Sequence, residues 1–283
     1  MKKTLVVLCL CCVLASYGFG SGFSLKLSGG LNYLMGGDYN EIIQGLNDWY
    51  HNATSASISN DFKKLKLGWN AGAELIVNFT DSLGLGLGVG YISASNKTTL
   101  TASVGAISQV DTYRPSISAV PITLNFHYFL PVGPRMNIHF FAGPGLYLGS
   151  VKLDNELIVQ ALATDYTASL KPDSSTAFGV QGGLGLEIGL SSNIFLVLDV
   201  QGRFAKFTEL KGPFTVSGTA YGLPINISGT GTIWYKEKLA GGTYYASWDV
   251  DAAQPTGTDL RNVHAASFSL SGISAQLGFR IAL

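Results

Sequence analysis

Apolar and polar residues alternate with period two in eight segments of this 283-residue chain. The clearest segment ends the sequence, and one of its faces carries Ile273, Ala275, Leu277, Phe279, Ile281 and Leu283. Between them lie Gly272, Ser274, Gln276, Gly278 and Arg280. The other segments are residues 23–33, 69–79, 83–93, 120–130, 138–148, 180–190 and 194–204. Alternation of this kind predicts β-strands with one apolar and one polar face.

The apolar faces have the length and the end residues of a surface that contacts lipid. Aromatic residues close both ends of the first two segments, Phe23 with Tyr33 and Trp69 with Phe79. Strands of ~10 residues with aromatic girdles are typical of transmembrane barrels. Beyond the N-terminal segment, no apolar run reaches the ~18 residues that a membrane helix needs. We therefore predict an all-β fold, an eight-stranded antiparallel up-and-down barrel that crosses a membrane.

The connections between these segments alternate in length. Residues 80–82, 131–137 and 191–193 form short turns, whereas residues 35–66, 96–117, 150–177 and 206–267 form long loops. Short periplasmic turns and long extracellular loops characterise outer-membrane barrels, so both termini are expected in the periplasm. Residues 98–110 and 214–234 are predicted to extend the barrel as hairpins outside the membrane. A ten-strand alternative inserts 214–234 into the wall, but Gly218, Gly229 and Gly231 interrupt its apolar face.

Residues 1–20 read as a signal peptide that is removed on export. Two lysines precede an apolar run over residues 5–14, and small residues follow, so cleavage is expected between Ser16 and Gly22. Cys9, Cys11 and Cys12 all lie in this segment. The mature chain, residues 21–283, is therefore predicted to be one barrel domain without a thiol or disulfide.

Six charged residues occupy inward positions of the predicted strands. Three are basic and three acidic: Lys26, Arg203, Arg280, Glu74, Glu187 and Asp199. An eight-stranded barrel is only wide enough for side chains to fill it, and buried charges must be paired. The spacing places Gly88 beside Glu74 and Gly185 beside Asp199, which leaves room for the carboxylates. We predict a polar network that plugs the lumen; the alternative is a path that conducts protons or solutes.

Two histidines, His127 and His139, also point inward and flank the 131–137 turn. They are expected to join the internal hydrogen-bond network, because no third ligand at suitable spacing supports a metal site. His51 and His264 lie in loops with no obvious partner. The sequence contains no nucleophile elbow, phosphate-binding loop or Ser/His/Asp arrangement, so we predict neither enzymatic activity nor a cofactor. The 18 basic and 18 acidic residues give no support to nucleic-acid binding.

The first long loop contains a predicted amphipathic helix. It starts with a capping-box-like sequence, Asp38 to Glu41, and its apolar residues follow at helical spacing: Ile42, Ile43, Leu46, Trp49 and Tyr50. We expect the helix to pack over the barrel mouth or against other loops; the alternatives are the outer leaflet or an apolar ligand pocket. Aromatic residues of the last long loop either cover this helix or form a recognition surface: Trp234, Tyr235, Tyr244, Tyr245 and Trp248.

The closing strand also resembles the carboxyl-terminal signal by which outer-membrane barrels are recognised for assembly, through Gln276, Gly278, Ile281 and Leu283. Such signals often end in Phe, whereas this one ends in Leu. With the eight segments, the inward charges and the strand sequence Ala142 to Tyr147, the chain resembles the small outer-membrane barrel superfamily. That superfamily includes the OmpA-like transmembrane domain and the OmpW-like and OmpX-like proteins. Unlike full-length OmpA-like proteins, this chain stops at the eighth strand, so no periplasmic domain is expected.

The resemblance implies a location in the outer membrane of a Gram-negative cell envelope. It implies contact with outer-membrane lipid and lipopolysaccharide, with the barrel-assembly machinery, and with an extracellular ligand or surface partner. Two functions stay open. The first is a structural or surface-interaction barrel without enzymatic activity. The second is a porin-like passive channel or transporter for small solutes, which the OmpW-like resemblance extends to hydrophobic ones.

Overall fold

The computed structural model describes residues 22–172 and 175–283, so the predicted signal peptide lies outside the described residues. Sixteen β-strands, one α-helix and one short 3-10 helix are described, and all strand pairs are antiparallel. The predicted all-β antiparallel architecture, with one helix after the first strand, is confirmed. No helix in these two ranges is long and apolar enough to cross a membrane.

Eight strands pair in a ring. In spatial order they are β1 (Phe23–Leu34), β3 (Leu67–Asn78), β4 (Leu83–Ser95), β6 (Ile107–Gly133), β7 (Met136–Val159), β9 (Ser175–Gly189), β10 (Ile194–Phe207) and β16 (Gly272–Ala282). Because β16 pairs with β1, the path of pairings returns to its start. The ring leaves these strands no open edge along their shared length.

The ring is staggered in the way that a tilted barrel requires. Registered partners can be followed from Phe23 on β1 through every strand to Ile273 on β16, which pairs with Tyr33 on β1. The path therefore returns to β1 ten residues further along the strand than it began. Strand number and stagger together fix the tilt and width of a barrel, and a ring of this size encloses room for side chains only.

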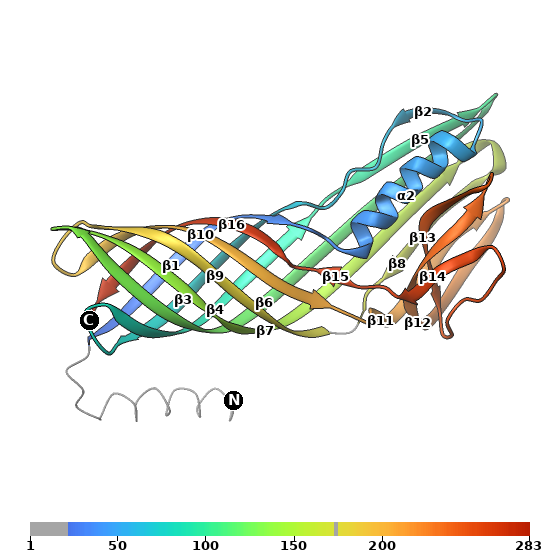
Figure 1. Cartoon of the computed structure of the whole chain (residues 1–283). Helices are drawn as coiled ribbons and strands as arrows, with labels where there is room; N and C mark the ends of the chain where they lie inside the picture. Colours follow the sequence, from blue (N-terminus) through green and yellow to red (C-terminus); the bar gives the residue numbers. More distant parts are fainter. Residues whose placement is uncertain (1–21, 173–174) are drawn as a thin grey trace.

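Beyond one end of the ring, the sheet continues as a large outer part (Figure 1). It contains the upper portions of β6 and β7 and eight further strands: β2 (Ser57–Asn60), β5 (Thr98–Val104), β8 (Thr164–Leu170), β11 (Lys211–Ala220), β12 (Leu223–Ala240), β13 (Thr243–Asp251), β14 (Leu260–Ala265) and β15 (Phe268–Ser269). The 3-10 helix η1 (Gln160–Leu162) joins β7 to β8. The predicted hairpins at 98–110 and 214–234 are confirmed as β5–β6 and β11–β12.

The loop and turn boundaries were partly wrong. Residues 96–117 and 150–177 were expected to be loops but are mostly strand, because β6 and β7 pair from Gln109 and Val159 down to Gly133 and Met136, with one gap at 124–125 and 143–144. For the same reason the expected 131–137 turn shrinks to two residues, 134 and 135. A register shift between Pro131 and Gly133 lets the ladder pass the proline, which has no N–H to donate.

Helix α2 (Asp38–Ala53) confirms the predicted helix but not its capping box. The cap residue is Gly37, with φ of 60°, and no side chain caps the first turn. The carboxylate of Asp38 is used elsewhere, because Oδ2 accepts hydrogen bonds from the backbone N and the Oγ of Ser267, both at 2.8 Å. At Gly45 the helix lies so close to the backbone of Ala246 on β13 that a Cβ would clash.

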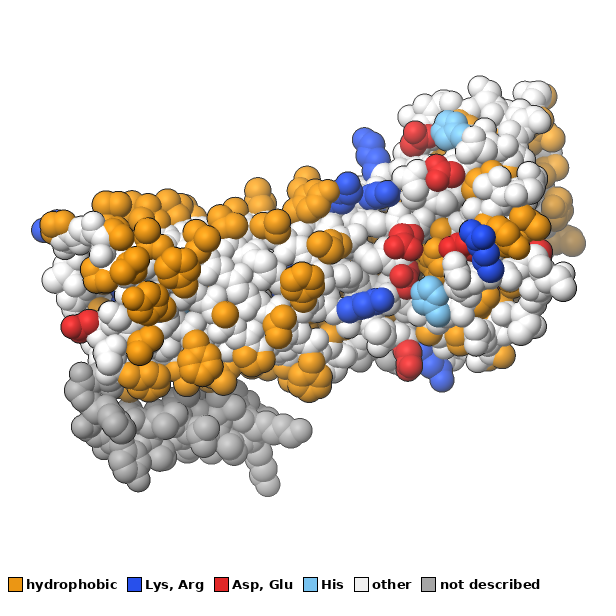
Figure 2. Space-filling view, in the orientation of Figure 1, with side chains coloured by type: hydrophobic (Ala, Val, Ile, Leu, Met, Phe, Trp, Pro, Cys, Tyr) orange, Lys and Arg blue, Asp and Glu red, His pale blue; other side chains and the backbone are white. Residues whose placement is uncertain are grey.

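Side chains alternate between the lumen and the outside as the sequence predicts. A band of exposed apolar side chains surrounds the ring, while charged side chains gather on the outer part (Figure 2). The buried apolar core lies between the ring and the outer part, where α2 and the outer strands cover the end of the lumen. At the opposite end of the ring, the backbone N of Leu283 donates to the O of Phe23 at 2.8 Å.

Candidate functional site: the lumen and the outer part

We call the end of the ring where Phe23 and Leu283 meet the lower end, and the end beside the outer part the upper end. The lowest layer of the lumen is a buried ion pair between Arg280 on β16 and Glu187 on β9. Arg280 donates from Nε to Oε1 at 2.8 Å and from Nη2 to Oε2 at 2.7 Å. Nη1 of Arg280 donates to Oγ of Ser24 at 3.1 Å. The guanidinium also lies 5.0 Å from the ring centre of Phe129 and 4.3 Å from that of Phe195. This geometry satisfies both charges and closes the lumen beside the chain ends.

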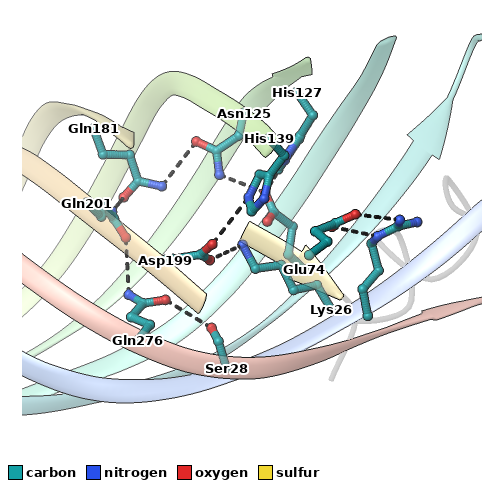
Figure 3. Close-up of polar contacts among 12 residues, drawn as sticks. Lys26, Ser28, Glu74, Asn125, His127, His139, Gln181, Asp199, Gln201 and Gln276 are labelled. Carbon is teal, nitrogen blue, oxygen red and sulfur yellow. Dashed lines mark hydrogen bonds and ion pairs between the residues drawn. The ribbon is translucent and has the colours of Figure 1, made fainter. Parts of the chain in front are cut away.

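The next layer holds a second ion pair and the two histidines (Figure 3). Nζ of Lys26 lies 2.5 Å from Oδ2 of Asp199, and Nε2 of His139 lies 3.3 Å from Oδ1 of the same carboxylate. Nε2 of His127 lies 3.1 Å from Oε1 of Glu74. The two imidazoles stack with centroids 6.1 Å apart, diagonally across β6 and β7 and not directly opposite. Within the described residues, no group of three His, Cys, Asp or Glu side chains could hold a metal ion.

A chain of side-chain hydrogen bonds crosses the middle of the lumen (Figure 3). Its five links run from Ser28 to Gln276 (3.1 Å), Gln276 to Gln201 (3.1 Å), Gln201 to Gln181 (2.7 Å), Gln181 to Asn125 (3.1 Å) and Asn125 to Glu74 (2.7 Å). It joins six strands of the ring, from β1 to β3 through β16, β10, β9 and β6. The sequence did not predict these amides as part of the network because they carry no charge, although the same alternation places them inward.

Arg203 overturns the expected pairing of three bases with three acids. Its Nε donates to the backbone O of Leu270 at 3.1 Å, and Nη2 donates to Oδ1 of Asn32 at 3.4 Å. Among the described residues no carboxylate lies within ion-pair distance of it. The cause is height: Arg203 lies opposite Gln181 and Gly272, above the level where Asp199 and Glu187 project. Glu74 correspondingly contacts Asn125 and His127 instead of a lysine or an arginine.

A small cavity of about 80 Å³ remains between these layers. Arg203 and Glu74 both line it, together with the amides of the hydrogen-bonded chain. It lies against β3, β4 and β6, where Gly72, Gly88 and Gly90 add no side-chain bulk. The predicted proximities of Glu74 to Gly88 and of Asp199 to Gly185 are direct register pairs.

The ladder between β4 and β6 is interrupted beside this cavity. Val89 pairs with Ile122 and Ile92 with Ala119, but the two positions between them, 90–91 on β4 and 120–121 on β6, are not paired. Pro121 lies in this gap and lacks the N–H that a ladder bond would need. The wall is therefore less completely bonded at this point.

Above the amide layer, the lumen is filled by apolar side chains. Tyr147, Phe207 and Leu270 are fully buried there and belong to one core cluster with residues of α2. Phe207 fills the space that the absent side chain of Gly149 leaves free. Two layers of side chains thus fill the lumen, a polar layer in its lower part and an apolar layer in its upper part.

Except for Trp234, which is half-buried outside it, the structure places the candidate recognition residues in or against this core. Ile42, Ile43, Tyr50 and Tyr235 are buried, and Leu46, Trp49 and Trp248 are partly buried against them. Trp234 donates from Nε1 to the backbone O of Asp251 at 3.1 Å. The two loop histidines do have partners: Nε2 of His51 lies 2.7 Å from Oδ1 of Asp61, and Nε2 of His264 lies 3.2 Å from Oδ2 of Asp38.

One buried carboxylate in the outer part has no basic partner. Oδ1 of Asp111 accepts from Nδ2 of Asn155 at 2.5 Å, and no base lies within ion-pair distance of it among the described residues. Burial raises the pKa of Asp111 to about 6, against the lowering effect of the Asn155 hydrogen bond. Burial likewise raises the pKa of Tyr235 to about 12. The outer part therefore contains a group that titrates at mildly acidic pH.

Comparison with known proteins gives the family. Residues 48–223 match the family described as an outer membrane protein beta-barrel domain, so the chain belongs to that family of outer-membrane barrels. The predicted resemblance is thereby confirmed. The sequence has no match among the curated proteins with which it was compared.

Two solved structures are similar over most of their length. The outer membrane protein OprG from Pseudomonas aeruginosa is 11% identical with a TM-score of 0.36, covering 92% of this chain and 95% of its own. A major outer membrane protein from Thermus thermophilus is 13% identical with a TM-score of 0.35, covering 93% of this chain and 100% of its own. At these identities and TM-scores neither structure informs the function of this chain.

Proposed function

We propose that this protein is a non-enzymatic outer-membrane barrel that holds a rigid β-sheet module at the cell surface. The eight strands of the ring cross the membrane, and the lumen is closed. The observation that carries this proposal is the double filling of the lumen, by the Arg280–Glu187 and Lys26–Asp199 layers below and by the Tyr147 and Phe207 layer above. A barrel filled with paired side chains has no aqueous path wide enough for a solute.

The orientation follows from the exposed surface. The apolar band on the ring suits hydrocarbon, whereas the outer part carries the charges and suits water (Figure 2). The end of the ring that lies away from the outer part carries the turns at 80–82 and 191–193. The hydrogen-bonded residues Phe23 and Leu283 lie at the same end. In this proposal they face the periplasm, and the outer part faces the medium.

The tips of the outer part support a role in surface contacts. Three connections end there: β5–β6, β7–β8 and β11–β12. Tyr221 and Leu223 at the β11–β12 turn are 75% and 68% exposed, and Val104 and Leu162 at the other two tips are also exposed. Large apolar side chains held in water at the far end of a rigid sheet are suited to contact another macromolecule.

Planar-bilayer recording on the refolded mature chain tests the closed lumen. We expect no steady conductance from the wild type. The Glu187→Gln, Arg280→Gln double variant should still insert, and a Lys206→Gln variant on the outside of the barrel serves as its control. Steady wild-type conductance that changes in the double variant but not in the control would contradict the proposal.

The interrupted β4–β6 ladder favours a second candidate, passage of small solutes between the cavity and the membrane. A gap in the hydrogen bonds lowers the cost of separating two strands locally. The Pro121→Val variant restores the missing N–H, while Pro213→Val, on β11 outside the ring and paired with Thr230, is the control. If solutes use this route, liposome uptake of small uncharged solutes should fall in Pro121→Val only. Equal uptake in both variants and in empty liposomes would exclude it.

A further inference from the structure

Three connections of the outer part end side by side, at the end of the molecule that lies away from the ring (Figure 1). They are residues 105–106 between β5 and β6, residues 160–163 between β7 and β8, and residues 221–222 between β11 and β12. The register brings them level, because Gln109 pairs with Val159 and Ile107 therefore lies level with η1. The N of Gly222 donates to the O of Ala163 at 2.9 Å, which ties the second connection to the third. The three connections thus form one end surface.

This end surface is apolar. Five large apolar side chains project from it into solvent, with exposed fractions between 39% and 75%: Val104, Ile107, Leu162, Tyr221 and Leu223. We call these five residues the apolar tips. The segments that carry them, 103–108, 159–164 and 219–228, contain no Asp, Glu, Lys, Arg or His. The charged residue closest to them in sequence is acidic, Asp165.

Tyr221 occupies a backbone conformation that a bulky residue rarely adopts. Tyr221 and Gly222 are the two central residues of the β11–β12 turn, with φ of 53° and 74°. Two-residue hairpin turns with both φ angles positive favour Asn-Gly or Gly-Gly, because a Cβ is crowded in the left-handed region. The tyrosine side chain is 75% exposed, so packing inside the chain does not compensate for this strain. Strained residues cluster at functional positions, and here the strain points to a contact outside the chain.

The chemistry of the apolar tips favours a lipid surface over a folded protein. Their side chains project from three separate turns, so each can enter a fluid layer on its own. Protein interfaces combine apolar contacts with about one hydrogen bond per 100–200 Å² and are enriched in arginine, whereas these segments carry no charged side chain. Tyrosine suits the boundary of a bilayer, because its ring is apolar and its hydroxyl reaches the headgroups.

The absence of basic residues from these segments decides the class of lipid. Attraction to anionic headgroups depends on lysine and arginine near the lipid surface. The three segments contain neither residue, and Asp165 would repel anionic headgroups. The matching surface is therefore a bilayer of zwitterionic lipid, whose headgroups carry no net charge.

We propose that the apolar tips insert into the headgroup region of a second bilayer, made of zwitterionic lipid, that faces the membrane in which the ring lies. Insertion by ~5–10 Å is enough to bury side chains of this size. The membrane around the ring is not the target, because the charged outer part separates the apolar tips from the apolar band (Figure 2). This inference specifies the surface contact of the proposed function and rests on its orientation.

Sedimentation with lipid vesicles tests the inference. The mature chain is placed in phosphatidylcholine nanodiscs, which surround the ring, and is mixed with dense, sucrose-filled phosphatidylcholine vesicles. Wild-type nanodiscs should sediment with the vesicles, whereas nanodiscs without protein should stay in solution. Vesicles of phosphatidylglycerol should not strengthen the association, because the apolar tips include no basic residue.

Substitutions in the β11–β12 turn measure the contribution of single side chains. Tyr221→Asn should weaken the association about tenfold and the Tyr221→Asn, Leu223→Asn double variant about 100-fold, which is ~1.4 kcal/mol for each apolar side chain withdrawn from lipid. Leu239→Asn, an exposed position near the other end of β12, is the control and should sediment as the wild type does. Because Asn-Gly is favoured in this turn, Tyr221→Asn should keep or raise the unfolding temperature while it weakens binding. A lower unfolding temperature would assign Tyr221 to the structure of the hairpin and would overturn its role in binding.

Four further results overturn the inference. The first is wild-type sedimentation no greater than that of nanodiscs without protein, and the second is equal sedimentation of the double variant and the wild type. A requirement for phosphatidylglycerol would assign the contact to basic side chains elsewhere. Association of wild-type nanodiscs with each other without vesicles, lost in the double variant, would assign the apolar tips to a second copy of this chain.

A single cysteine separates this inference from the proposed function. Ala106 is exposed in the β5–β6 turn, so a membrane-impermeant maleimide should label Ala106→Cys in intact cells. Failure to label it would contradict the orientation in the proposed function. Labelling in cells without sedimentation of the nanodiscs would contradict the lipid contact alone.

Discussion

Arg280 and Glu187 face each other across β10, and the guanidinium of one meets the carboxylate of the other through two hydrogen bonds of 2.8 and 2.7 Å. Both side chains are buried. The pair therefore closes the lower lumen by linking strands that are not neighbours in the ring. Pairs of this kind contribute little when both partners are replaced together, but much when one partner is left alone.

Replacement of Arg280 by Gln should destabilise the barrel strongly. The change leaves Glu187 buried without a base, which costs ~3–5 kcal/mol. Urea unfolding from lipid vesicles, followed by tryptophan fluorescence, measures the effect. The Arg280→Gln, Glu187→Gln double variant should recover much of the loss, because two amides can bond each other. A double variant as unstable as the sum of the two single variants would mean that the two residues do not interact.

The same substitution at Arg203 should cost less. Arg203 has no carboxylate to abandon, and its hydrogen bonds go to the O of Leu270 and to Asn32. Arg203→Gln should therefore lower the free energy of unfolding by ~1–2 kcal/mol, the range for hydrogen bonds lost from a buried acceptor. The measurement is the same urea titration, run beside Arg280→Gln. An equal or larger loss at Arg203 would show that an acidic group compensates it after all.

The stability of the outer part should depend on Asp111 between pH 4 and pH 7. The folded pKa of this carboxyl is about 6, above its ordinary 3.8. Between these values the folded protein holds a proton that the unfolded chain does not, so stability rises as pH falls through 6 and is lost as pH rises through it. Two pKa units correspond to ~3 kcal/mol at most.

Thermal unfolding in detergent at pH 5 and pH 7.5 checks the sign. The wild type should unfold at a higher temperature at pH 5. Asp111→Asn keeps an acceptor for Nδ2 of Asn155 and cannot titrate, so its change between the two pH values should be smaller. An identical pH response in both proteins would assign the effect to another group.

The contact of α2 with β13 predicts an effect opposite to helix propensity. Alanine in place of Gly45 should favour the isolated helix by about 1 kcal/mol. In the folded chain, however, a Cβ at this position meets the backbone of Ala246, so the helix must move away from the sheet. We expect Gly45→Ala to lower the unfolding temperature. Gly202→Ala on β10 is the control, because its Cβ would meet only the O of Gly182 at 3.9 Å. A rise in unfolding temperature for Gly45→Ala would contradict the close packing.

The sequence predicted the wall strands well because the lipid-facing pattern is local and regular. The alternation alone assigns residues such as Leu25, Leu27 and Leu31 to the outward face of the strand. The outer part was harder, since the alternation changes its phase along β6 and β7. Ser116, Ser118 and Ser150 are half-buried on the outward face, whereas the apolar Ile117 and Val151 are buried on the inward face.

The pairing of charges inside the lumen depends on the heights of the side chains along the barrel, which the alternation of a single strand does not give. Inward direction correctly placed Arg203 with the other charges, but its height relative to Glu187 and Asp199 depends on the ten-residue stagger of the ring. Stagger comes from the register of every strand pair together. The register between β10 and β16 could not be deduced across residues 206–267, so Arg203 was given a carboxylate partner that it lacks.

Single cysteines can test the proposed orientation directly. The predicted mature chain has no cysteine, so Ser192→Cys in the β9–β10 turn and Ala252→Cys after β13 each introduce one exposed thiol. If the outer part faces the medium, a membrane-impermeant maleimide should label Ala252→Cys in intact cells. It should reach Ser192→Cys only after the outer membrane is permeabilised, because that turn lies at the end of the ring where Phe23 and Leu283 meet. Labelling of both thiols in denatured protein controls for their reactivity. The reverse pattern in intact cells would invert the proposed orientation and place the outer part in the periplasm.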